Sequence, residues 1–199
     1  MADNSKAAAV ATIIIVAVFA AIFLSLSRPD FPLVNKPVSE ITSLTISGNS
    51  SDIVYPELAE ANFVILEPGS WLVTAQFVDD SAGSEEPEIY DRNFTVISED
   101  MKSIGDALYG GLNQTRISEV SVQMLLEQSP SIWYDIEVTY ADGSWIYIAT
   151  FQTDPGYILF NHGRGVPDRN LINGRVLEPL SALDSLVSAI YAVFSNHLE

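Results

Sequence analysis

The chain of 199 residues has no cysteine and few basic side chains. The lack of cysteine excludes disulfide bridges, thiolate metal sites, iron–sulfur clusters and a cysteine nucleophile. Lysine and arginine together number 9, against 26 aspartate and glutamate residues, so the formal net charge is −17. Nucleic acids and anionic membrane surfaces repel a protein of this charge, and we expect no nucleic acid among its partners.

Motifs of catalysis are also missing from the sequence. It has two histidines, His162 and His197, and neither an H-E-x-x-H zinc motif nor a G-x-S-x-G nucleophile elbow. Phosphate-binding and dinucleotide-binding glycine loops are absent as well. We therefore expect a protein that is not an enzyme and that needs no cofactor or metal. Two carboxylates distant in sequence can still meet in a fold, which keeps a membrane-tethered hydrolase as an alternative.

The longest feature that is present is an uncharged run from Ala7 to Leu26. As a helix, twenty residues cover about 30 Å, the thickness of the hydrocarbon core of a bilayer. The run predicts a transmembrane helix over residues 7–27, after a short tail of residues 1–6 and before a proline-rich spacer of residues 28–37. Membrane lipid would contact residues 7–27, and residues 38–199 would form the exposed domain.

Two other interpretations of this segment remain open. Ser25-Leu26-Ser27 has the small-x-small pattern at which a signal peptide is cleaved. Lys6-Ala7-Ala8-Ala9 resembles the basic-small-apolar junction that archaeal prepilin peptidases cut. The second resemblance implies a pilin-like filament subunit whose apolar helix packs in the filament core.

Three sequons follow the apolar run and begin at Asn49, Asn93 and Asn113. An N-x-[ST] sequon marks a candidate glycosylation site on an outward-facing surface. The sequons favour a single-pass cell-membrane protein whose C-terminal domain faces the exterior.

Periodicity predicts the elements of this domain. Alternating apolar residues and turn signals predict strands over residues 41–47, 62–66, 71–78, 89–97, 133–140, 145–152 and 157–161. Met101, Ile104 and Leu108 predict a helix that begins near Ser98 and ends at Gly110-Gly111. Residues 117–126 favour a strand, with a helix as the alternative. A last helix after Pro179 carries an apolar stripe, formed by Leu183, Leu186, Val187, Ile190, Tyr191 and Phe194.

The strongest local signal is a hairpin whose tip is Asp142-Gly143. A two-residue type I′ turn at this tip would place Tyr140 opposite Trp145. That register gathers apolar side chains on one face, namely Tyr134, Ile136, Val138, Tyr140, Trp145, Tyr147, Ala149 and Phe151. The predicted fold class is α+β: an N-terminal transmembrane helix followed by an antiparallel sheet with two helices packed on one face. The first four strands leave a separate lobe as an alternative.

Two loops contain candidate site residues. The glycine-rich loop after residue 161 concentrates positive charge, and its binding candidates are His162, Arg164, Arg169 and Arg175. Arginine forks bind carboxylates or phosphates, although pairing with acids of the same chain is the alternative. A weaker calcium loop would use Asp79, Asp80, Glu85 and Glu86, although acidic hairpin tips are often only solvated.

These features together predict a membrane-anchored protein whose acidic domain acts as a non-catalytic accessory or interaction module at the cell surface. The expected partner is another membrane or surface protein. The pilin-like subunit and the membrane-tethered hydrolase remain the alternatives.

Overall fold

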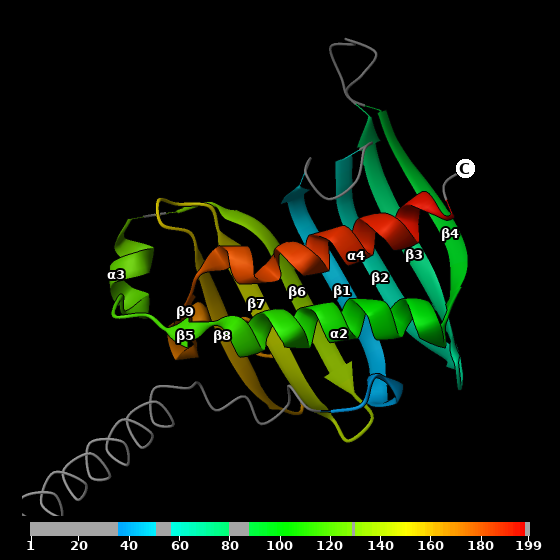
Figure 1. Ribbon diagram of the computed structural model, residues 1–199, viewed down its shortest axis with the longest axis horizontal. Helices are drawn as coiled ribbons and strands as arrows, with labels where there is room; N and C mark the ends of the chain where they lie inside the picture. The colour runs from blue at the N-terminus through cyan, green and yellow to red at the C-terminus, as the bar shows by residue number, and fades with distance from the viewer. Residues whose placement is uncertain (1–35, 51–56, 80–87, 129, 198–199) are drawn as a thin grey trace, which may run out of the picture. The chain divides into compact units, whose positions relative to one another are not determined.

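A computed structural model describes residues 36–50, 57–79, 88–128 and 130–197 of the chain (Figure 1). The segment 7–27, for which the sequence predicts a transmembrane helix, lies outside the described residues. So do the spacer up to residue 35 and residues 80–87 of the acidic loop.

The described chain forms one antiparallel sheet of nine strands in the order β4-β3-β2-β1-β6-β7-β8-β9-β5. Strand β1 pairs with both β2 and β6, so the first four strands do not form a separate lobe. The strands are β1 (Ile41–Ser50), β2 (Glu57–Glu67), β3 (Ser70–Asp79), β4 (Glu88–Ile97), β5 (Arg116–Ile117), β6 (Ile132–Tyr140), β7 (Ser144–Phe151), β8 (Tyr157–Arg164) and β9 (Arg175–Glu178).

Two long helices lie across one face of this sheet (Figure 1). They are α2 (Ser98–Gln114) and α4 (Asp184–Ser195), and the short helix α3 (Val122–Glu127) lies at the far end of the sheet. Three short 3-10 helices are η1 (Val38–Glu40), η2 (Leu171–Asn173) and η3 (Leu180–Leu183). The main core between the sheet and the two long helices contains the fully buried rings of Phe63, Phe77 and Phe194.

No helix among the described residues is long and apolar enough to cross a membrane. The predicted fold class, a transmembrane helix followed by an antiparallel sheet with two helices packed on one face, is wrong, because the described sheet also carries a third helix, α3, which packs on the opposite face. The described fold is one large, mostly β structure with nine strands and three α-helices.

The hairpin of β6 and β7 forms where the sequence predicts it, but its register differs by one residue. Trp145 pairs with Thr139, because the loop is Ala141-Asp142-Gly143 and Gly143 adopts φ +75°. Three-residue loops of this kind combine a type I turn with a glycine bulge. A slip of one residue turns every side chain of a strand to the other face.

The predicted aromatic face is consequently divided between two cores. Tyr134, Ile136, Val138 and Tyr140 pack under α2 and α4 in the main core. Trp145, Tyr147, Ala149 and Phe151 face the opposite side of the sheet, where Leu125 of α3 and Leu171 of η2 cover them.

Two further predictions of local structure are corrected. Residues 117–126 are not one strand, because β5 ends at Ile117 and the helix α3 begins at Val122. Helix α2 does not end at Gly110-Gly111 but continues to Gln114. A Cβ atom on Gly111 would collide with the Ala182 carbonyl oxygen, so this glycine allows η3 to approach α2 closely.

Candidate functional site

The predicted binding loop contains two arginines that are paired within the chain. Arg164 Nη2 lies 3.1 Å from Asp142 Oδ2, and Arg169 Nε lies 2.9 Å from Glu137 Oε2. His162, near the end of β8, and Arg175, at the start of β9, are exposed and form no ion pair with any residue in the described ranges. The structure thus directs the two paired arginines to different parts of the sheet, one to the β6–β7 tip and one to strand β6.

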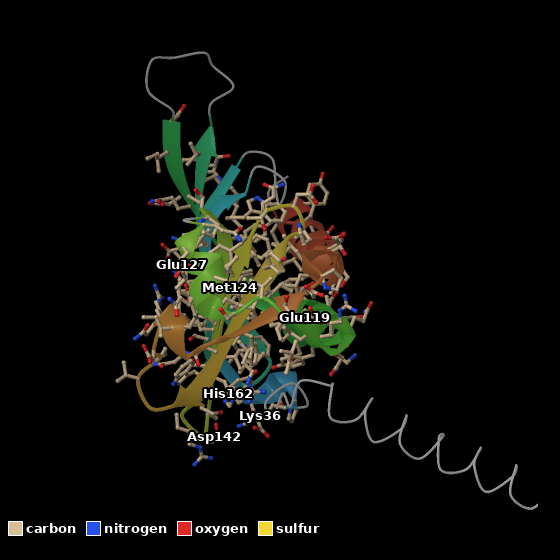
Figure 2. The ribbon with its side chains drawn as sticks, turned by 90° about the vertical axis from the view of Figure 1, so that its left-hand side faces the viewer. Lys36, Glu119, Met124, Glu127, Asp142 and His162 are labelled. Carbon is tan, nitrogen blue, oxygen red and sulfur yellow. The ribbon has the colours of Figure 1, made fainter. Side chains whose placement is uncertain are left out.

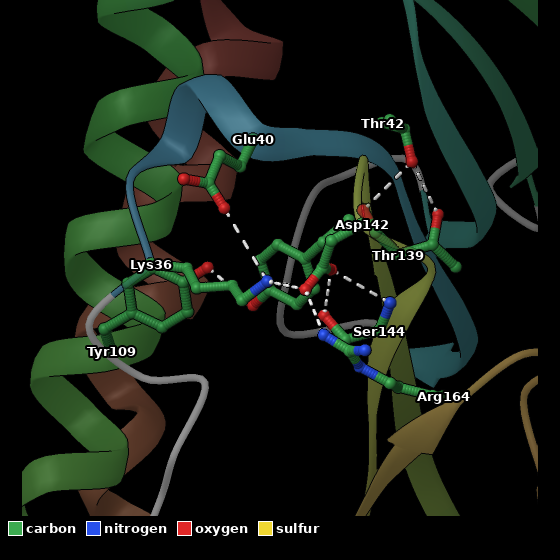
Figure 3. A network of polar contacts seen from close by, with 9 residues as sticks. Lys36, Glu40, Thr42, Tyr109, Thr139, Asp142, Ser144 and Arg164 are labelled. Carbon is green, nitrogen blue, oxygen red and sulfur yellow. Dashed lines mark hydrogen bonds and ion pairs between the residues drawn. The ribbon is translucent and has the colours of Figure 1, made fainter.

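The tip of the β6–β7 hairpin holds a polar network (Figure 3). Lys36 Nζ lies 2.7 Å from Asp142 Oδ2 and 5.0 Å from the centre of the Tyr140 ring. Asp142 also accepts hydrogen bonds from the Ser144 amide and hydroxyl. The hydrogen bond from Lys36 and those from Ser144 hold the pKa of Asp142 well below its usual range. The network fastens Lys36 to the hairpin tip, which is a structural role.

A groove of about 370 Å³ lies between η1 and the first half of α2. Trp71 contributes to its lining, and the buried indole N–H of Trp71 has no hydrogen-bond partner among the residues that the structure describes. The two lysines at the groove are already paired, Lys36 with Asp142 and Lys102 with Asp106. No uncompensated charge therefore converges on this groove.

The face of the sheet opposite α2 and α4 offers a larger surface. Successive side chains of a strand point to opposite faces. In β2, Phe63 is fully buried in the main core, so Val64 points to the other face. We call this side of strands β4, β3, β2, β1 and β6 the open face. Farther along the sheet, at β7 and β8, the same side is buried by α3 and η2.

Exposed aliphatic side chains gather at one end of the open face. Val64 pairs directly with Leu72, and Leu66 follows Val64 by two residues. Ile97 pairs with Ser70, two residues before Leu72, so it is the diagonal neighbour of Leu72 across the β3–β4 pair. Their exposed fractions are 47% for Val64, 59% for Leu66, 36% for Leu72 and 58% for Ile97. We call these four residues the aliphatic patch. Such patches on soluble proteins often mark interaction sites.

The middle of the open face is polar and internally hydrogen-bonded. Thr45 donates to the Asn62 side-chain oxygen over 2.8 Å, and the Asn62 amide donates to Glu60 over 2.7 Å. In the next row along the strands, Ser47 donates to Asp135 over 2.5 Å. These bonds restrict the side-chain rotamers, so the face presents a defined set of acceptors.

A row of carboxylates crosses the open face four to six residues from the aliphatic patch. Strand pairing places Asp135, Ser47, Glu60, Gln76 and Asp91 in one row across five strands. Glu60, Gln76 and Asp91 help to line a shallow hollow of about 160 Å³. Asp135 also accepts a hydrogen bond from Tyr147, whose pKa is raised by burial and by this carboxylate.

The other predicted sites are placed as follows. Asn93 is exposed in the middle of β4 and Asn113 is exposed in the last turn of α2, whereas the side chain of Asn49 lies outside the described part. Among the calcium candidates, Asp79 ends β3, its side chain is not described, and Asp80, Glu85 and Glu86 lie outside the described ranges. Within those ranges, no group of three or more histidine or acidic residues could hold a metal ion.

Sequence reasoning missed the open face. Alternation in residues 62–66 and 71–78 shows that two sets of side chains face opposite ways, and this was the available signal. It does not show which set the helices cover, because that depends on packing between segments far apart in the chain.

Comparisons with known proteins assign no family to the chain. No protein-family model matches it, and searches of curated proteins and of solved structures gave no match. The function is therefore proposed from the geometry of the open face.

Proposed function

We propose that the protein is a non-catalytic interaction module that binds a partner protein through the open face of its sheet. The aliphatic patch is the observation that carries this proposal. Val64, Leu66 and Ile97 are each about half exposed on neighbouring paired strands of the sheet. Burial of apolar surface contributes roughly 25 cal/mol per Å², so covering the patch supplies affinity.

The polar part of the face defines the chemistry of the partner. Glu60, Asp91 and Asp135 form a row of carboxylates across the open face, and the chain carries a net charge of −17. Complementary charge speeds association and selects partners. The expected partner surface has aliphatic side chains at one end and lysine or arginine about four to six residues farther along the strand direction.

Affinity purification from the organism that makes the protein tests the proposal. Full-length chains carrying Leu72→Lys or Met124→Lys are compared with the unchanged chain by quantitative mass spectrometry. Met124, labelled in Figure 2, is the matched control, because it is an apolar residue 54% exposed on α3, and α3 covers β7 and β8 rather than the five strands of the open face. We expect at least one co-purified protein to be lost with Leu72→Lys and retained with Met124→Lys.

Charge substitutions extend the same experiment. Glu60→Lys should also release that protein, and its retention by the unchanged chain should weaken as salt rises, because exposed charges are screened. The proposal is refuted when every co-purified protein is retained equally by Leu72→Lys and Met124→Lys chains that remain folded.

A further inference from the structure

The two edges of the sheet are protected very differently. Strand β5, at one edge, has two residues, whereas β4 at the other edge has ten. Within the described ranges β4 pairs only with β3, so its outer side offers backbone N–H and C=O groups to another strand. Proline and lysine are common protections of such edges, and β4 contains neither; its charged side chains are Glu88, Asp91 and Arg92.

Strand β4 also carries two exposed isoleucines. Ile89 and Ile97 lie near its two ends, both on the open face, with exposed fractions of 60% and 58%. Ile97 belongs to the aliphatic patch, but Ile89 lies eight residues away and is not part of it. A surface that covers only the patch leaves Ile89 in water.

A second copy of β4 would pair with the outer edge of this strand and contact both exposed isoleucines. Two identical strands pair in antiparallel fashion around a two-fold axis perpendicular to the sheet, which keeps both open faces on the same side. Residues directly opposite each other must then share a face. One central residue therefore lies opposite its own copy, and the two-fold axis passes midway between these two copies. Each choice of central residue gives a different set of opposing side chains.

The register centred on Asn93 is the favourable one. It places Ile89 of each copy opposite Ile97 of the other, and Asp91 opposite Thr95, which can donate a hydrogen bond. On the helix-covered face it places Tyr90 opposite Val96 and Arg92 opposite Phe94. These pairings follow from the order of residues in β4, and no like charges oppose one another.

The neighbouring registers are less favourable. An axis through Arg92 brings two guanidinium groups together, and an axis through Asp91 brings two carboxylates together. An axis through Phe94 places the Asp91 carboxylate opposite Ile97. Like charges directly opposite each other destabilise a strand pair.

We propose that β4 is a homodimer edge, at which a second copy of this chain adds its own β4 in antiparallel fashion around Asn93. The dimer extends one sheet through both copies and packs Ile89 of each copy against Ile97 of the other. Because each copy has a net charge of −17, the copies repel each other and the dimer tightens as salt rises. A glycan on Asn93 blocks this dimer.

The chain has no cysteine, so engineered cysteines report the register without interference. Full-length Asn93→Cys, Asp91→Cys, Thr95→Cys and Asn113→Cys chains are treated separately with a short thiol-to-thiol cross-linker in mild non-ionic detergent. In the proposed dimer the two copies of position 93 are direct neighbours, about 5 Å apart. The two copies of position 91 are offset by four residues, about 13 Å along the strands. Asn113, exposed on α2, reports random collision.

We expect Asn93→Cys to form covalent dimers at least tenfold faster than Asn113→Cys, and faster at high salt. Asp91→Cys and Thr95→Cys should cross-link efficiently only when the two chains are mixed. Adding Ile89→Lys to the Asn93→Cys chain should return its rate to that of Asn113→Cys. The proposal is overturned when folded Asn93→Cys chains cross-link no faster than Asn113→Cys, or when Asp91→Cys alone cross-links faster than Asn93→Cys.

Discussion

Replacing Phe194 with alanine tests how α4 holds the sheet. The ring is fully buried and meets Phe63, Phe77 and Phe94 edge-on, with centroids 6.2, 5.6 and 5.4 Å away. Removing a buried phenylalanine ring costs about 3–5 kcal/mol of unfolding free energy. The three aromatic contacts, worth about 0.5–1.5 kcal/mol each and not additive, place the expected loss near the upper end of that range.

Urea unfolding of the full-length chain measures this loss. With a slope of about 2 kcal/mol per molar urea, a loss of about 4 kcal/mol lowers the midpoint by about 2 M. Tyr191→Ala is the control, because Tyr191 lies three residues earlier on α4 and is 53% exposed. It should cost less than about 1 kcal/mol. Equal midpoints for the two variants would show that the ring does not anchor α4 to the sheet.

Three further predictions concern single positions. Gly110→Ala should stabilise the protein by up to about 1 kcal/mol, since nothing lies within 4 Å of the added methyl group. Gly111→Ala should destabilise the protein, because its methyl group would collide with η3, and thermal melts compare the two variants. Gly143→Val should cost about 1–2 kcal/mol in the same assay through its φ of +75° alone, and a melt equal to wild type would contradict the bulged turn. Because folding lowers the pKa of Asp142, this carboxylate stabilises the protein above about pH 4, and the contribution is lost as the pH falls. The melting temperature of the Asp142→Asn variant should therefore depend less on pH in acid than that of the unchanged chain. An unchanged pH profile would refute the role of the Lys36–Asp142 pair.

The residue ranges of most strands along the chain could be predicted from local sequence patterns. Asp142-Gly143 marks the tip of the β6–β7 hairpin, and Pro68-Gly69 marks the turn between β2 and β3, where Gly69 has φ +93°. Turn residues and alternating side chains act over a few neighbours, so one sequence shows them.

Register and long-range pairing could not be predicted in this way. Whether a tip with Asp142-Gly143 forms a two-residue or a three-residue loop depends on packing on both faces of the sheet. The difference of one residue in loop length determines the face on which Trp145 lies. Strand β5 pairs with β9 although Ile117 and Leu177 are sixty residues apart. The uncharged run led to the prediction of a transmembrane fold, which the described helices do not bear out.

The candidate site shows the same division. The arginines of the glycine-rich loop were visible as a local concentration of charge, but the pairing of Arg169 with Glu137 requires the fold. Val64 and Leu72 looked like ordinary strand residues, and only the placement of α2 and α4 on the other face leaves them exposed.

Photo-cross-linking in the organism that makes the protein tests the central claim of binding through the open face most directly. A photoreactive phenylalanine derivative replaces Leu72 in one full-length chain and Met124 in another, two exposed apolar positions on different surfaces. We expect a discrete covalent adduct with a second protein from position 72, weakened by Glu60→Lys, and no such adduct from position 124. Adducts of equal yield and identity from both positions, or none from position 72 in a folded chain, would contradict the claim.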